Sequence, residues 1–146
     1  MKGTTALTAV LTLTLQALAM AHVSVLPRES QPGVEERYTI RVPTEGTVAT
    51  TTVSLEIPAG VTVLKIEETE GATFEVQKQG DRIVAITWKK EIKPKEASEF
   101  IFRARNSESA AQIDWKTHQR FADGTVADWV GPAGDRRPAA VTKIVR

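Results

Sequence analysis

Residues 37–42 read Arg-Tyr-Thr-Ile-Arg-Val, so every second side chain is apolar. Alternation with a period of two is typical of a β-strand that has one buried face and one solvated face. The same alternation recurs at 53–57, Val-Ser-Leu-Glu-Ile, and at 100–104, Phe-Ile-Phe-Arg-Ala. These three stretches predict half-buried strands.

Further short β-rich runs lie on both sides of these stretches, with turn signals such as Pro58-Ala59-Gly60 and Ala122-Asp123-Gly124 between them. Many short strands without a long segment of period 3.6 indicate an antiparallel β-sandwich. The strands that we expect are 23–26, 37–42, 50–57, 61–67, 73–77, 83–88, 98–104, 112–121 and 125–130, with a tenth at 141–145.

The composition limits the class of protein. A chain of 146 residues, 41% hydrophobic, is long enough for one ordinary domain. The net charge of +1 and the absence of a basic block argue against nucleic acid as a partner. There is no cysteine, which excludes disulfides, thiolate nucleophiles and iron–sulfur clusters.

The first 21 residues have the three-part plan of a cleavable signal peptide. Lys2 gives a positive start, an apolar run follows, and Ala19-Met20-Ala21 forms a small-x-small cleavage signal. The apolar run is shorter than the roughly 20 residues that a membrane-spanning helix needs. We therefore expect a domain of residues 22–146 that is exported to the periplasm or the extracellular space and carries no membrane anchor.

Cleavage after Ala21 would make His22 the first residue of the mature protein. Its free amine and its imidazole Nδ1 could then close a six-membered chelate ring on one metal ion. Two neutral nitrogen ligands suit copper(II) best among the divalent first-row ions. Both methionines precede His22, so the mature chain contains no sulfur ligand for copper(I). The alternative is that His22 is a solvated terminal residue with no ligand role.

The predicted topology indicates which side chains can reach His22. Antiparallel pairing of the first two strands places the loop after Val42 near the amino terminus, and Glu45 is the carboxylate of that loop. The hairpin tip at 122–124 commonly gathers at the same end of a Greek-key sandwich, which would bring His118 and Trp129 into range. Glu29 lies at the other end of the first hairpin and ranks lower. Each of these residues also has an interpretation without a metal. Glu45 could be an exposed loop acid, Trp129 could pack in the core, and His118 could be a surface residue of a strand.

We do not expect an enzyme. The chain has two histidines, no Gly-x-Ser-x-Gly elbow and no glycine-rich phosphate loop. A copper-dependent redox enzyme would require His118 to converge on His22.

Several motifs, in order along the chain, resemble the YcnI-like family of exported copper-binding domains. They are Ala21-His22-Val23-Ser24-Val25, Pro27-Arg28-Glu29-Ser30, Arg41-Val42-Pro43-Thr44-Glu45, Ala49-Thr50-Thr51, Ile57-Pro58-Ala59-Gly60-Val61, Glu99-Phe100, and Phe121-Ala122-Asp123-Gly124-Thr125 with Trp129.

The resemblance implies an immunoglobulin-like β-sandwich that binds copper(II) through a single-histidine brace. The brace consists of the terminal amine and the imidazole of the first mature residue, here His22. A family glutamate maps by position onto Glu45, with Glu29 as the second choice, and a tryptophan near the copper maps onto Trp129. The implied role is copper homeostasis in the cell envelope, as a chaperone that exchanges copper with another envelope protein. Two alternatives remain: a metal-free envelope interaction or adhesion module, and a copper-dependent redox enzyme.

Overall fold

The computed structural model describes residues 21–146, and within them the chain forms twelve strands. The predicted signal peptide falls almost entirely outside the described residues. The strands are β1 (Ser24–Leu26), β2 (Glu29–Ser30), β3 (Glu35–Pro43), β4 (Thr50–Glu56), β5 (Thr62–Ile66), β6 (Thr73–Gln79), β7 (Arg82–Ile92), β8 (Ala97–Arg105), β9 (Gln112–Trp115), β10 (Thr117–Phe121), β11 (Val126–Trp129) and β12 (Ala140–Ile144).

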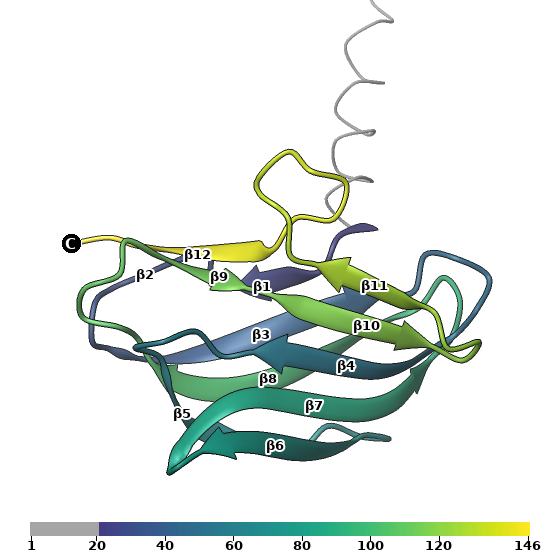
Figure 1. The fold of residues 1–146 in the computed structure, drawn as a ribbon, viewed down its shortest axis with the longest axis horizontal. Coiled ribbons are helices and arrows are strands. Elements are labelled where there is room, and N and C mark those ends of the chain that lie inside the picture. Colours follow the sequence, from purple (N-terminus) through teal and green to yellow (C-terminus); the bar gives the residue numbers. More distant parts are fainter. Residues whose placement is uncertain (1–20) are drawn as a thin grey trace, which may run out of the picture.

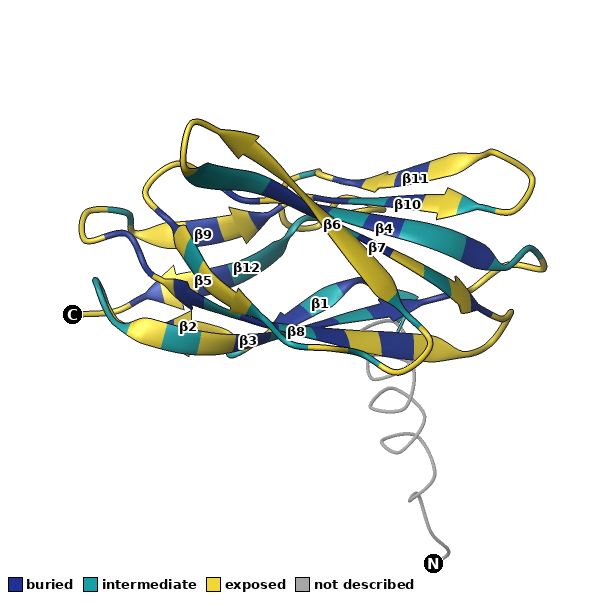
Figure 2. Cartoon of the chain, turned by 90° about the horizontal axis from the view of Figure 1, so that it is seen from below, coloured by how far each residue is buried: buried dark blue, intermediate teal, exposed yellow. Residues whose placement is uncertain are grey.

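The strands form two main layers and a small side sheet. One layer has the order β1-β3-β8-β5, the other has the order β11-β10-β4-β7-β6, and β2-β12-β9 forms the third sheet. The pairings within the two main layers are antiparallel. Figure 2 shows the two main layers facing each other, with buried and more exposed residues alternating along several strands. This is the all-β sandwich that the alternation predicts.

The core lies between the two layers and is rich in aromatic rings. In β3 the alternating residues Tyr38, Ile40 and Val42 are completely buried. Trp88 of β7 stacks on Phe100 of β8 with ring centroids 4.9 Å apart, so the two layers meet through aromatic contact. All the strands and the whole core that the structure describes lie within residues 22–146.

One predicted strand is two strands in the structure. The stretch 112–121 divides at Lys116, because Gln112–Trp115 pairs with β12 whereas Thr117–Phe121 pairs with β4 and β11. The side-chain alternation continues through the division, with Trp115 and Thr117 both buried. The exchange of strand partners at Lys116 therefore does not interrupt the alternation of buried and exposed side chains.

The pairing of β1 with β3 positions the beginning of the domain. Ser24 lies opposite Arg41 and Leu26 lies opposite Thr39, so His22 is at the end of β3 from which the Pro43–Gly46 segment leaves. Figure 1 shows the loop between β11 and β12 beside the first residues of the described chain. Among residues 21–146, no helix has the length and apolar character required to span a bilayer.

Candidate metal centre

His22 stands between two surface cavities at this end of the sandwich. One cavity, of about 470 Å³, is lined by His22 together with Glu45, Asp123 and Trp129. A second cavity of about 460 Å³ is lined by His22, Arg28 and Asp135. Residues from four separate parts of the chain therefore surround one histidine.

The His22 imidazole is partly exposed and contacts the ring of Trp129. The two ring centroids are 5.7 Å apart and the planes are tilted by 58°. Within the described chain the imidazole has no hydrogen-bond partner, so its ring nitrogens are available to a ligand. Trp129 itself is 7% exposed and fixes one side of the imidazole.

Glu45 belongs to the turn that follows β3 and lines the same cavity as His22. Its side chain is exposed and has no ion pair or hydrogen bond with the residues that the structure describes. The backbone beneath it is fixed, because the buried Thr44 hydroxyl donates to the carbonyl of Ile92 over 2.9 Å. Glu29, by contrast, is in β2 beside Lys143 and lines neither His22 cavity.

Asp123 is a second carboxylate in the cavity, and sequence reasoning treated it only as a turn residue. Its Oδ1 accepts hydrogen bonds from the Thr125 hydroxyl, over 2.7 Å, and from the Thr125 amide, over 3.0 Å. These bonds lower the pKa of Asp123, so it remains ionised to lower pH than an ordinary aspartate. Gly124 completes the turn at a φ of +85°, a conformation that glycine adopts without strain.

A buried glutamine supports the floor of the cavity. Gln119 of β10 is 1% exposed, and its Oε1 accepts a hydrogen bond from Trp129 Nε1 over 3.0 Å. Its Nε2 donates to the carbonyl of Pro43 over 2.9 Å and to the Thr50 hydroxyl over 2.7 Å. Gln119 thus connects the tryptophan beside His22 to the strand end that carries Glu45. Its inward position in the alternation of 117–121 was the one signal that could have identified it.

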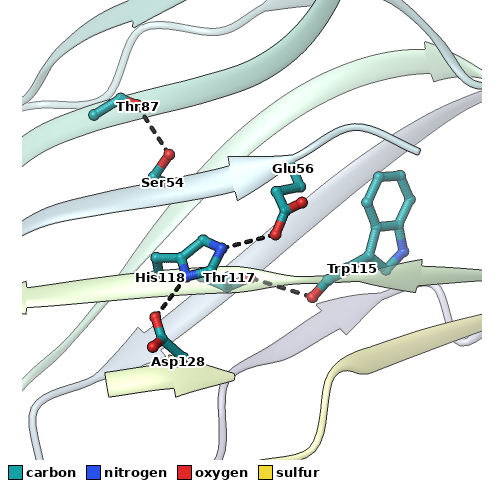
Figure 3. Close-up of polar contacts among 7 residues, drawn as sticks. All are labelled: Ser54, Glu56, Thr87, Trp115, Thr117, His118 and Asp128. Atoms are coloured by element: carbon teal, nitrogen blue, oxygen red, sulfur yellow. Dashed lines mark hydrogen bonds and ion pairs between the residues drawn. The ribbon is translucent and has the colours of Figure 1, made fainter. Parts of the chain in front are cut away.

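His118 does not reach the His22 cavity. It points outward from β10, between Asp128 of β11 and Glu56 of β4 (Figure 3). Nδ1 lies 2.6 Å from Asp128 Oδ1, and Nε2 lies 2.7 Å from Glu56 Oε2, so both ring nitrogens are occupied. The buried neighbours Thr117 and Gln119 face the core, and the period of two therefore directs His118 to the outer face.

The loop from Gly131 to Ala139 contributes residues that sequence analysis assigned no role. Arg136 and Arg137 line the larger cavity with His22, and Asp135 lines the smaller one. The Gly131 amide donates to the Arg137 carbonyl over 3.0 Å, and the Ala139 amide donates to the Gly131 carbonyl over 2.9 Å. These bonds close the base of the loop. No periodic pattern marks such a segment, so its position could not be predicted.

The donors in the cavity fit a metal that prefers nitrogen and oxygen. An imidazole and two carboxylates are present, and the chain has no sulfur after Met20. Within residues 21–146, no group of three or more His, Asp or Glu side chains is arranged to hold a metal ion by side chains alone. A metal at His22 would therefore need a further donor, and a free terminal amine would supply one.

A domain-family model described as "Domain of unknown function (DUF1775)" matches residues 22–144, which is nearly the whole described chain. The chain belongs to the DUF1775 family. The "Copper-binding protein CutI" of Bacillus subtilis (strain 168) is 35% identical over 131 residues. That alignment covers 88% of this chain and 64% of the relative, so the chain spans less than two thirds of the relative's length. Together these findings confirm the YcnI-like family that the motifs predict.

Solved structures confirm the fold of this DUF1775 domain. An uncharacterised protein from Nocardia farcinica, described as having an immunoglobulin-like fold, superposes with a TM-score of 0.78 at 24% identity, covering 86% of this chain and 99% of that one. A non-cellulosomal cohesin from Archaeoglobus fulgidus superposes with a TM-score of 0.52 at 11% identity, covering 86% and 91%. The immunoglobulin-like antiparallel β-sandwich is thus confirmed.

Proposed function

We propose that this protein is an exported copper(II)-binding protein of the cell envelope, in which His22 forms a single-histidine brace after cleavage behind Ala21. The observation that carries the proposal is the unpartnered His22 imidazole in a cavity with Trp129 and two carboxylates. A 35% identical relative is named as a copper-binding protein, which supports copper as the ligand. Copper would be the cargo of a chaperone or homeostasis protein that exchanges it with a partner in the envelope.

In this site the amine and imidazole nitrogen of His22 would chelate copper, and Glu45 would add a carboxylate oxygen. Asp123 is the competing carboxylate, because it lines the same cavity and its Thr125 hydrogen bonds keep it ionised. Trp129 would shield one side of the site. The position of His118 on the outer face, held by two carboxylates, supports binding of copper over a redox enzyme with two histidine ligands.

The test is a copper(II) titration of two forms of the protein. One begins at His22 and the other keeps Met20-Ala21 ahead of it, and electron paramagnetic resonance reports the ligands. We expect tight 1:1 binding with nitrogen and oxygen ligands only when the His22 amine is free. Equal and weak copper binding by both forms would exclude the histidine brace. A metal-free interaction module would then explain the function of the domain better.

Carboxylate variants identify the oxygen ligand in the form that begins at His22. We expect Glu45→Gln to weaken copper binding and to change the resonance spectrum, while Glu29→Gln, on a strand that lines neither cavity, changes neither. If Asp123→Asn changes copper binding and the spectrum while Glu45→Gln does not, the oxygen ligand is Asp123 in the hairpin between β10 and β11 and not Glu45.

A further inference from the structure

Two cations line the His22 cavity without a partner. The side chains of Arg136 and Arg137 are exposed, and neither has a hydrogen bond or ion pair with the rest of the described chain. The adjacent Asp135 forms no ion pair with either arginine among the described residues: its Oδ1 accepts the Arg136 backbone amide over 2.7 Å, and the residue lines the other cavity. Two guanidinium groups are therefore free to bind an anion beside His22.

The loop that carries these arginines is held in place by its own backbone. The hydrogen bonds between Gly131 and Arg137 and between Ala139 and Gly131 fix both ends of the segment. A Cβ on Gly131 would overlap the Asp135 side chain, whose Cβ lies 2.9 Å from that position, so the close approach depends on glycine. Preorganisation of this kind lowers the entropic cost of binding.

The size of the cavity and its charges point to a small anion. A volume of about 470 Å³ lies in the range that small-molecule sites occupy. Without metal, Arg136 and Arg137 offset the charges of Glu45 and Asp123, which line the same cavity, so an anion in the copper-free cavity is bound by the hydrogen bonds of the two unpaired guanidinium groups. A bound copper(II) ion would add two positive charges to this cavity. A dianion that enters with the metal would restore the balance.

A carboxylate is an anion that can bind both to the arginine side chains and to a copper ion in this cavity. The planar guanidinium fork binds a carboxylate through two parallel hydrogen bonds, and carboxylate oxygen is also a ligand for divalent copper. A molecule with two or three carboxylates could place one on the arginines and another at the metal. We propose that this cavity binds a small di- or tricarboxylate through Arg136 and Arg137. Copper would reach His22 as such a complex, a consequence that rests on the proposed function.

The test measures malonate binding to the copper-free chain that begins at His22, by calorimetry at low salt. We expect Arg136→Gln/Arg137→Gln to weaken malonate binding at least tenfold. The matched control, Arg105→Gln/Arg120→Gln, removes two exposed arginines that line neither cavity and should leave the affinity unchanged. Arg136→Lys/Arg137→Lys keeps the charge without the fork and should give an intermediate affinity.

Three outcomes would overturn the proposal: no malonate binding, equal loss in the control variant, or binding of acetate and inorganic phosphate as tight as that of malonate. Circular dichroism of each variant verifies the fold. The same proteins are titrated with copper(II), which separates the two proposals. If the chain that begins at His22 fails to bind copper but still binds malonate through the two arginines, only the histidine brace is contradicted. Copper binding without malonate binding would count against the carboxylate site alone.

Discussion

Gln119 joins three segments of the chain through one buried side chain. Its amide contacts Trp129, Pro43 and Thr50, and all its polar atoms are satisfied. Gln119→Leu has a similar volume but would leave the Trp129 Nε1 and the Pro43 carbonyl without this partner. An unsatisfied buried polar group costs about 1–3 kcal/mol. We therefore expect Gln119→Leu to lower the free energy of unfolding by about that amount, measured by urea denaturation.

Gln112→Leu is the matched control, because Gln112 is exposed and bonds to the nearby Asp114. This surface substitution should change stability by no more than about 0.5 kcal/mol. If both substitutions lower the free energy of unfolding equally, the buried hydrogen bonds of Gln119 do not contribute to stability.

The surroundings of His118 act on its pKa in opposite directions. Burial lowers the pKa, but the hydrogen bonds with Asp128 and Glu56 outweigh it and raise the pKa above 6.5. Since the folded-state pKa exceeds the unfolded one, the resulting stabilisation is complete below pH 6.5 and is lost as pH rises through the folded pKa. His118→Gln should therefore destabilise the protein more at about pH 5.5 than at about pH 9.

Urea denaturation across this pH range, with a chelator present, measures the effect. His22→Gln serves as the control, because His22 has no hydrogen-bond partner among the described residues. A His118→Gln penalty that stays constant with pH would contradict a charged His118 between the two carboxylates.

At the scale of the element, the prediction of strands from sequence succeeded where a pattern of period two existed. The alternation at 37–42 corresponds to the core of β3, and antiparallel pairing of β1 with β3 brings His22 to the segment that carries Glu45, as the topology predicts. The division of 112–121 into β9 and β10 was missed, because the exchange of hydrogen-bonding partners at Lys116 leaves the alternation intact. The two-residue strand β2 is too short to produce a pattern.

Residues 131–138 lie between the last two predicted strands, but their role could not be predicted, because the position of this segment depends on hydrogen bonds at Gly131. Gly131→Ala tests this dependence. The added Cβ would displace Asp135 and with it the closure of the loop. We expect faster hydrogen exchange at the amides of residues 131 and 139, which donate the closing bonds. Gly46→Ala is the control, since a Cβ there meets no atom within 4 Å. Unchanged protection in Gly131→Ala would show that the loop tolerates the side chain.

On the scale of the whole molecule, the candidate site unites parts of the sandwich that are distant in sequence. His22 precedes β1, Glu45 follows β3, Asp123 lies between β10 and β11, and the two arginines precede β12. The sequence indicated His22 through the predicted cleavage site and Glu45 through the pairing of neighbouring strands. It could not indicate the arginines, because the packing of a loop against the first residues of the domain follows no local rule.

A metal that joins these parts should stabilise the whole fold, because a ligand that binds only the folded state shifts the unfolding equilibrium. At a free copper(II) concentration 100 times the Kd, the gain is about 2.7 kcal/mol, which corresponds to a rise in Tm of roughly 10 °C for a domain of this size. We expect this rise for the chain that begins at His22 and a far smaller one for the chain that begins at Met20, since only the former has a free amine on the histidine. Scanning calorimetry with and without copper measures both. His22→Ala in the shorter chain should abolish the gain, and an equal rise in all three proteins would mean that copper binds elsewhere on the sandwich.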